Sequence, residues 1–225
     1  MRALNPTEPR TSWPSGQWQA ATWHDYLHYR ETLDPHQFRL FFHQGYLLVV
    51  EMGWEGIDHA TICDLFTMIL GFWFSLYPEQ TASSLGRCLL EKEKDEAGAP
   101  DLVLYVGDDY PKWEPGKPRR INLNQWRVPD LVGEIADTTL TSDLDEKKQL
   151  YAALGIPEYW VVDVRGQQVL AFALQADGKY QKIARSQVLP GLPIALLKQT
   201  LMHLEQGSNI QAALWFRQQV SALKR

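Results

Sequence analysis

Apolar residues recur every three to four positions across residues 57–76. Ile62, Leu65, Ile69 and Trp73 fall on one face at this spacing, which is the pattern of a helix packed against a core. The segment therefore predicts one long, deeply packed helix. The same period, over fewer residues, predicts helices at 23–33, 144–154 and 209–223.

Other apolar runs are short and are bounded by turn residues, which is typical of strands. The runs at 101–106 and 130–135 are almost wholly apolar, as in strands that are buried on both faces. Gln44-Gly45 and Asp177-Gly178 predict tight hairpin turns. Strands are accordingly predicted at 37–42, 46–52, 87–91, 101–106, 130–135, 158–164, 168–174 and 180–183.

The predicted helix at 144–154 carries clear end signals. Ser142 or Asp143 precedes it with an acidic residue three positions on, which is the pattern of a capping box. Gly155 and Pro157 follow it and are typical of a helix end.

The order of these elements is helix, hairpin, long helix, strands, helix and hairpin. It predicts an α/β (α+β) domain with a mixed sheet flanked by helices. The chain has 225 residues, of which 45% are hydrophobic, enough to bury a substantial core. We expect a weakly ordered leader at 1–20, one domain at 21–205 and a C-terminal helix at 206–225.

Composition excludes several classes of protein. The longest apolar run, 65–77, is shorter than a membrane span needs, and the N-terminus lacks the apolar stretch of a secretory signal. A cytoplasmic protein with no membrane association is therefore expected. Cys63 and Cys88 are too few for a disulfide framework or a four-cysteine zinc site, so both are expected to be reduced core thiols.

The charge balance argues against a protein that binds nucleic acid strongly and non-specifically, but it does not exclude one. The net charge is −5, from 22 Lys+Arg against 27 Asp+Glu, whereas strong non-specific binding to nucleic acid needs a basic surface. A nuclease whose acidic groups hold a cation remains compatible with this balance. Arg119 and Arg120, in the proline-rich loop at 107–120, could contact phosphates, or this loop is simply solvated.

Three residues combine into candidate chemistry. Asp101 opens one buried-type strand and Glu134 lies inside the next, where a carboxylate is costly unless something compensates for its charge. A divalent cation such as magnesium is one such compensator. Lys147 shares a helix face with Leu150 and Tyr151, so its amine can neutralise the carboxylates or stabilise charge on a phosphate.

Structural roles explain each residue equally well when it is taken alone. Asp101 can cap a turn at the start of its strand, and Glu134 can be paired or lie at a sheet edge. Lys147 can extend to solvent while its stem packs against the core. Spacing and composition alone do not name a reaction.

These residues also resemble a known family. Asp101, Glu134 and Lys147, with the string DLDEKKQLYAALGIPEYWVVD at 143–163, resemble the putative restriction endonuclease family of the PD-(D/E)XK nuclease superfamily. In that family a Pro-Asp strand and a Glu strand precede a K-x-x-x-Y helix and a G-V/I-x-E-Y-W strand. The resemblance covers roughly residues 22 to 200, and it includes an N-terminal hairpin at 45–52.

The resemblance implies a mixed sheet of about four core strands flanked by helices, with an added N-terminal hairpin. It also implies that Asp101, Glu134 and the Ile135 carbonyl hold Mg²⁺ or Mn²⁺, while Lys147 positions the water that attacks a phosphodiester. The superfamily lysine normally lies two residues after the Glu, where this chain has Ala136, so the lysine must reach in from the helix. Accessory candidates that the resemblance suggests are His59, Glu55, Lys148, which is the substitute for Lys147, and Tyr151.

The leading hypothesis is a metal-dependent endonuclease that cleaves DNA, with a homodimer as one way to place two sites across a duplex. One alternative is a nuclease-fold module that binds nucleic acid or protein without cutting. Another is a metal-dependent hydrolase of a different phosphoester. Fold alone does not separate these alternatives.

Overall fold

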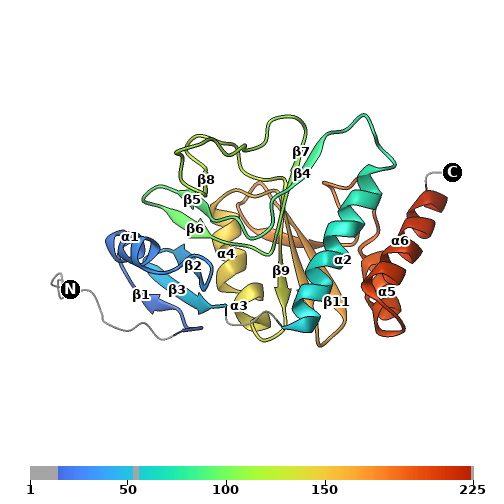
Figure 1. The fold of residues 1–225 in the computed structure, drawn as a ribbon, viewed down its shortest axis with the longest axis horizontal. Coiled ribbons are helices and arrows are strands. Elements are labelled where there is room, and N and C mark those ends of the chain that lie inside the picture. Colours follow the sequence, from blue (N-terminus) through green and yellow to red (C-terminus); the bar gives the residue numbers. More distant parts are fainter. Residues whose placement is uncertain (1–14, 53–55, 224–225) are drawn as a thin grey trace.

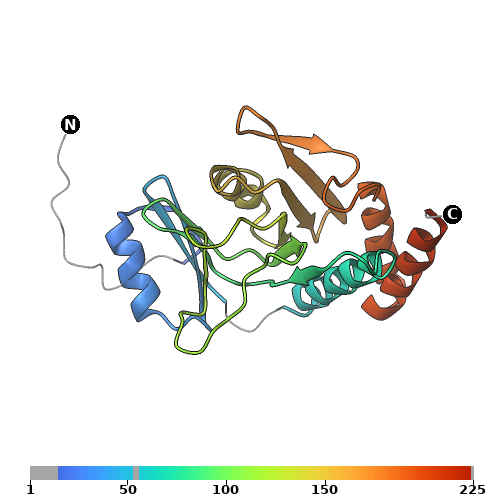
Figure 2. The same cartoon turned by 90° about the horizontal axis from the view of Figure 1, so that it is seen from above.

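The computed structural model describes residues 15–52 and 56–223. Its elements form layers that follow one another along the long axis of the molecule (Figure 1). Helix α1 lies at one end, followed by a first sheet, helix α4, a second sheet and helix α2, with helices α5 and α6 at the other end. Figure 2 shows the same succession from above.

The second sheet contains the strands on which the candidate chemistry lies. Its order is β12-β11-β10-β9-β7-β4, and every pairing is antiparallel except β9 with β10. The strands are β4 (Ala82–Ser84), β7 (Leu102–Val106), β9 (Leu131–Ala136), β10 (Glu158–Asp163), β11 (Gln168–Leu174) and β12 (Tyr180–Ile183).

The first sheet is built around the predicted N-terminal hairpin. Its order is β1-β3-β2-β6-β5-β8. The strands are β1 (Gln19–Ala20), β2 (Phe38–His43), β3 (Tyr46–Glu51), β5 (Leu90–Lys92), β6 (Glu96–Gly98) and β8 (Ile121–Asn122). Gln44 and Gly45 connect β2 to β3 with φ values of 46° and 79°, the left-handed conformation that a tight hairpin turn requires.

The helices fill the spaces beside and between the sheets. Leu102, Leu131 and Ile135 pack on α2 with α5 and α6, whereas Val103 and Val132 face α4 and the first sheet. This alternation follows from the two-residue period of a strand. The helices are α1 (Trp23–Thr32), α2 (Ile57–Phe74), α3 (Leu140–Leu144), α4 (Glu146–Ala153), α5 (Ile194–Glu205) and α6 (Asn209–Leu223).

Most predicted elements are present, but several differ. The helix predicted at 144–154 is present as α4, but it begins only at Glu146, because Asp145 (φ −120°, ψ −89°) separates it from the short helix α3. The predicted cap is wrong, since no side chain caps α4, and Ser142 instead accepts a hydrogen bond from Trp18 at 2.9 Å. The strand predicted at 87–91 begins only at Leu90, because the residues before it pass from one sheet to the other.

Other differences concern elements that the prediction omitted. Helix α5 and the short strands β1, β4, β6 and β8 were not predicted. Residues 1–14 of the expected leader lie outside the described residues, while Gln19–Ala20 pair with β3. Cys63 is buried as predicted, but Cys88 is only half-buried. The added N-terminal hairpin belongs to the first sheet, separate from the sheet that carries Glu134.

Within the described part of the chain, α2 is the one helix that is long and apolar enough to cross a membrane. Asp58 and Asp64 interrupt its apolar run. Seven of its side chains are buried among the strands of the second sheet, α5 and α6. Burial in the core therefore accounts for its composition.

Two glycines give a matched test of the packing around the strand that follows Asp101. A Cβ on Gly86 would lie 2.5 Å from the carbonyl oxygen of Asp101, whereas a Cβ on Gly71, inside α2, meets nothing within 4 Å. We expect Gly86→Ala to lower the free energy of unfolding by about 2 kcal/mol through overpacking. Gly71→Ala should raise it by about 0.5–1 kcal/mol through helix propensity.

Urea unfolding followed by tryptophan fluorescence measures both changes. Equal effects of the two substitutions would contradict the close approach of residue 86 to Asp101.

Candidate active site

Asp101 lies immediately before β7, which pairs with β9 and β4 in the second sheet. Its buried carboxylate accepts a hydrogen bond from the backbone N–H of Ile135 at 2.9 Å. Arg39, from β2, forms an ion pair with Oδ1, and His59 Nε2, from α2, lies 3.3 Å from Oδ2. Asp101 therefore joins four separate elements.

Glu134 lies inside β9 and is 2% exposed. Its neighbours Val132 and Ala136 face α4, and Glu134 shares this face because alternate strand residues point the same way. The hydroxyl of Tyr151 donates to Oε1 at 2.5 Å, and Lys147 Nζ lies 3.3 Å from Oε2. The carboxylate thus has a donor on each oxygen, which a buried carboxylate needs.

Lys147 reaches Glu134 from α4, and its side chain is buried. Nζ also lies 2.8 Å from Asp143 Oδ1 and 4.3 Å from the centre of the Phe41 ring. The hydroxyl of Thr139 donates to the other oxygen of Asp143 at 2.6 Å. The amine is therefore held between two carboxylates and an aromatic face.

The environment shifts the acidities of these groups in different directions. Although burial disfavours its charge, the His59 hydrogen bond and the charge of Arg39 hold the pKa of Asp101 well below its usual range. Burial raises the pKa of Glu134 to about 8. Burial also opposes the charge of Lys147, but the carboxylates of Glu134 and Asp143 outweigh it and raise the pKa of this amine.

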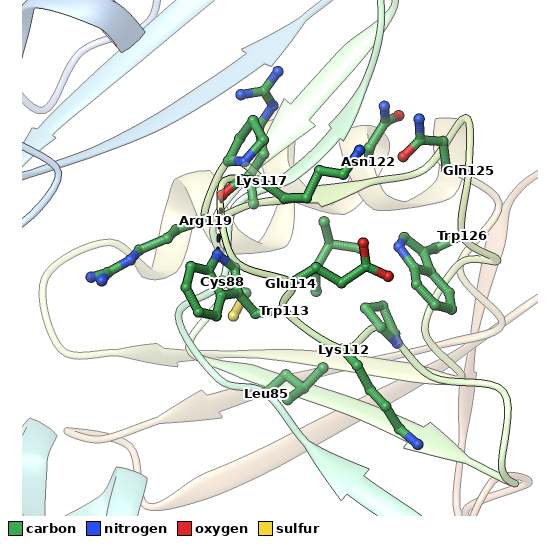
Figure 3. A pocket seen from close by; sticks show the side chains of 14 residues that line it. Leu85, Cys88, Lys112, Trp113, Glu114, Lys117, Arg119, Asn122, Gln125 and Trp126 are labelled. Atoms are coloured by element: carbon green, nitrogen blue, oxygen red, sulfur yellow. Dashed lines mark hydrogen bonds between the residues drawn. The ribbon is translucent and has the colours of Figure 1, made fainter.

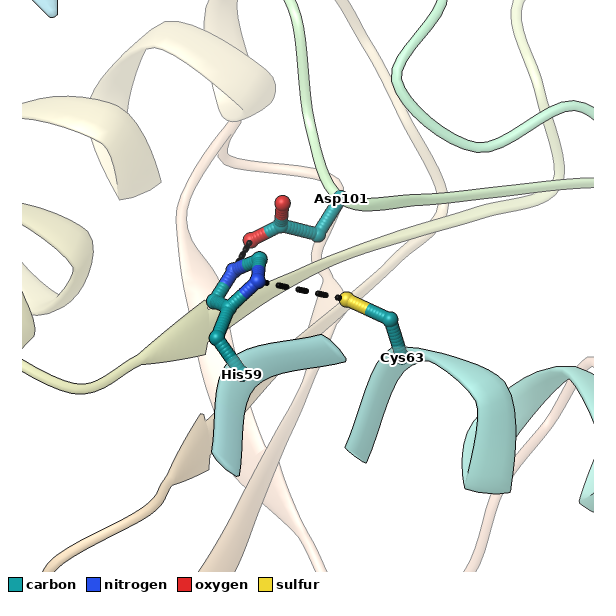
Figure 4. A group of neighbouring side chains, drawn as sticks. All are labelled: His59, Cys63 and Asp101. Carbon is teal, nitrogen blue, oxygen red and sulfur yellow. Dashed lines mark hydrogen bonds and ion pairs between the residues drawn. The ribbon is translucent and has the colours of Figure 1, made fainter. Parts of the chain in front are cut away.

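His59 connects Asp101 to a thiol. The hydrogen bonds to Asp101 and Cys63 raise the pKa of His59 to about 10, so the imidazole is cationic at neutral pH. Cys63 Sγ lies 3.7 Å from His59 Nδ1, one turn further along α2 (Figure 4). One ligand atom from each of the three residues lies within 4.8 Å of the others.

The site contains a cavity of about 210 Å³, whose lining includes Arg39, His59, Asp101, Glu134 and Lys147. A second pocket, of about 750 Å³, lies over the proline-rich loop and shares no lining residue with the first (Figure 3). The predicted catalytic residues line the smaller of these two cavities, so cavity volume does not identify the candidate active site.

The structure brings together most of the residues singled out in the sequence. Asp101, Glu134, Lys147, His59 and Tyr151 meet, and the Ile135 backbone faces Asp101. Lys148 instead lies over the Phe172 ring, 4.0 Å from its centre, and does not replace Lys147. Glu55 lies outside the described residues.

Two residues of the site were not predicted. Arg39 sits in a strand of the first sheet, and nothing in its local pattern indicates a distant aspartate. Asp143 was considered only as a helix cap, yet its position four residues before Lys147 was a usable signal, because an acid and a lysine at this spacing can pair.

Two overlapping sets of donors could hold a metal ion. Asp101, Glu134 and the Ile135 carbonyl offer only oxygen, which hard cations such as Mg²⁺ and Mn²⁺ prefer. His59, Cys63 and Asp101 offer one nitrogen, one sulfur and one oxygen, a set better suited to a softer ion such as Zn²⁺. Asp101 belongs to both sets. The oxygen donors fit the ion that a phosphodiester hydrolase uses.

Comparisons with known proteins identify the family and the fold. The sequence matches the family model described as putative restriction endonuclease (Uma2) over residues 23–205. Among solved structures, the chain is similar to a putative nuclease belonging to DUF820 from Anabaena variabilis, with a TM-score of 0.53 and 16% identity. The alignment covers 80% of this chain and 98% of that one. No curated protein matches the sequence.

The neighbouring lysines of α4 offer a matched test of the buried ion cluster. We expect Lys147→Met to lower the free energy of unfolding at neutral pH by about 3 kcal/mol, because it leaves buried carboxylates without their cation. Lys148→Met removes a partly exposed amine and should change it by no more than about 0.5 kcal/mol. Chemical denaturation of both variants measures this, and equal losses would contradict the arrangement.

Proposed function

We propose that this chain, which belongs to the putative restriction endonuclease family, is a metal-dependent endonuclease that hydrolyses phosphodiester bonds of DNA. The supporting observation is that Asp101, Glu134 and Lys147 come from three separate elements and line one cavity. The family match and the nuclease fold of the structural neighbour support a nuclease. The metal and the DNA substrate are part of the proposal.

In this proposal Asp101 and Glu134 hold Mg²⁺ or Mn²⁺ together with the Ile135 carbonyl. The N–H of Ile135 points to Asp101, and the N–H and C=O of one strand residue point to the same side. The carbonyl is therefore suitably directed. When bound, the ion would supply an acidified water and would stabilise negative charge on the phosphate.

Lys147 acts as a donor in this mechanism, because its raised pKa keeps the amine protonated. An ammonium has three N–H donors, and Asp143 and Glu134 form ion pairs with it on two sides. The third N–H can donate to the attacking water or to a phosphate oxygen, where it stabilises the charge that develops in the transition state. Asp143 is a positioning residue for this amine.

Arg39 and His59 add two cations beside Asp101. Both line the cavity, so their charges favour an anionic substrate in a chain whose net charge is −5. The local balance of the cavity, not that of the whole chain, governs the approach of a phosphate.

The same two cations favour a second candidate function, a nuclease-fold module that binds nucleic acid without cutting it. Arg39 and His59 already neutralise Asp101, and the raised pKa of Glu134 keeps much of this carboxyl protonated at neutral pH. A chain that has lost its metal would have these features. Titration with a divalent cation separates the two candidates.

Cleavage is tested on supercoiled plasmid with Mg²⁺ or Mn²⁺. We expect the parent to nick the plasmid, and Glu134→Gln and Lys147→Met to reduce the rate at least about 100-fold, as loss of a transition-state contact does. Lys148→Met should retain the parent rate. Equal nicking by all four proteins would indicate a contaminating nuclease, and no nicking by the parent in the presence of bound metal would favour the binding module.

Metal affinity should depend on pH, because the carboxylate form of Glu134 is the ligand and its pKa is about 8. Below that pKa each metal bound displaces a proton. The affinity for Mn²⁺ should therefore rise about tenfold between pH 6.5 and pH 7.5. Calorimetric titration with Mn²⁺ measures this affinity. The Glu134→Gln variant should bind Mn²⁺ more weakly and with a smaller pH dependence. A parent affinity that does not change with pH would contradict the assignment of Glu134 as a ligand.

A further inference from the structure

The proline-rich loop encloses the pocket of about 750 Å³ that the proposed mechanism does not use (Figure 3). Loops of this length without helix or strand are uncommon and are usually functional or disordered. This one is held in place: the Trp113 indole donates to the Lys117 carbonyl at 3.0 Å, and Arg120 forms an ion pair with Glu91 at 2.9 Å. The pocket is therefore a built feature of the loop.

Two indoles line this pocket. Trp113 is 58% exposed, although a side chain of this size normally buries most of its apolar surface. Trp126 lines the pocket from the segment after β8, and Figure 3 shows the two rings on opposite sides of Glu114. Trp126 is partly buried and packs on the core. An exposed ring and a fixed ring in a concave site are suited to stacking on a flat ligand.

Positive charge surrounds the indoles. Lys112, Lys117, Arg119 and Arg120 line the pocket against one acid, Glu114, whereas the whole chain is acidic. Arg120 is paired with Glu91. Among the described residues, Lys112, Lys117 and Arg119 form no ion pair. Arg119 lies 5.8 Å from the centre of the Trp113 ring and Lys112 lies 5.0 Å from that of Tyr110, contacts that leave their charges unneutralised for an anion.

The pocket also offers groups that recognise bases. Asn122 and Gln125 carry amides on its wall, and an amide can both donate to and accept from the edge of a base. The Glu114 carboxylate can accept from an exocyclic amine. Flat rings, amides and surrounding cations together match a nucleotide: a base to stack, an edge to bind and a phosphate to neutralise.

We propose that this pocket binds an unpaired nucleotide of single-stranded DNA, with the base against Trp113 or Trp126 and the phosphate near Lys112, Lys117 and Arg119. A base inside a duplex is stacked on its neighbours and cannot enter such a site. The inference builds on the proposed nuclease function, because it gives the substrate a second point of attachment.

The pocket is connected to the strand that follows Asp101. Leu85, in its wall, donates its backbone N–H to the Val103 carbonyl at 2.9 Å. Cys88 lines the pocket next to Arg87, whose N–H donates to the Pro100 carbonyl at 2.9 Å. One strand of DNA bound in this pocket is therefore held beside the element that positions the proposed metal ligand.

Fluorescence anisotropy of an end-labelled single-stranded oligonucleotide, with EDTA present to prevent cleavage, tests the proposal. We expect Trp113→Ala to weaken binding about tenfold, since stacking on one aromatic ring is worth about that much. The double variant Lys117→Ala/Arg119→Ala should weaken binding and reduce its dependence on salt. The duplex of the same sequence should bind more weakly than the single strand.

The controls lie elsewhere on the surface. Tyr46→Ala removes an exposed ring, and Lys179→Ala/Lys182→Ala removes two cations of the β11–β12 hairpin. Both should bind as the parent does. Binding that is lost equally in the controls, that is unchanged in the pocket variants, or that favours the duplex would overturn the proposal.

The outcome is separable from that of the proposed function. Glu134→Gln should retain single-strand binding, because it alters only the other cavity. Loss of binding in the pocket variants without nicking by the parent would support the nucleotide site and reject the nuclease. Nicking that depends on Glu134, with binding unaffected by the pocket variants, would do the reverse.

Discussion

The buried ion cluster of Lys147, Glu134 and Asp143 is the interaction on which the site depends. It ties the α3–α4 unit to the middle of the second sheet, with distances of 3.3 Å and 2.8 Å from Nζ to the two carboxylates. Charges taken out of water are costly unless each finds a partner. The cluster therefore fixes the position of α4, and any rearrangement that separates the three groups leaves a buried charge unpaired.

Asp101 has a corresponding role in the same cavity, beside this cluster. It receives His59 from α2 and Arg39 from β2, together with the Ile135 N–H of the adjacent strand. One carboxylate thus joins both sheets and the long helix. The proposed metal would add a cation at a point where Arg39 and His59 already place two.

The two cavities divide the requirements of a nuclease between them. The smaller one has buried carboxylates and an amine, as hydrolysis needs, but little apolar surface for a base. The larger one has indoles, amides and cations, as nucleotide binding needs, but only one acid. Chemistry requires groups of perturbed acidity at fixed distances, whereas substrate binding requires an exposed and mostly cationic surface.

The sequence by itself determined the main helices and strands, because their hydrophobic periods are strong. It also determined the pairing of Lys147 and Tyr151 on one helix face, which depends only on local spacing. Only the tertiary structure decided that Arg39 meets Asp101, that helix α4 begins only after Asp145, and that the hairpin starts a separate sheet. These features depend on contacts between residues far apart in the chain, of which local pattern carries no record. Helix α5 is different: Ile194, Leu197 and Leu201 recur at helical spacing and are buried, so its pattern was a usable signal that the prediction omitted.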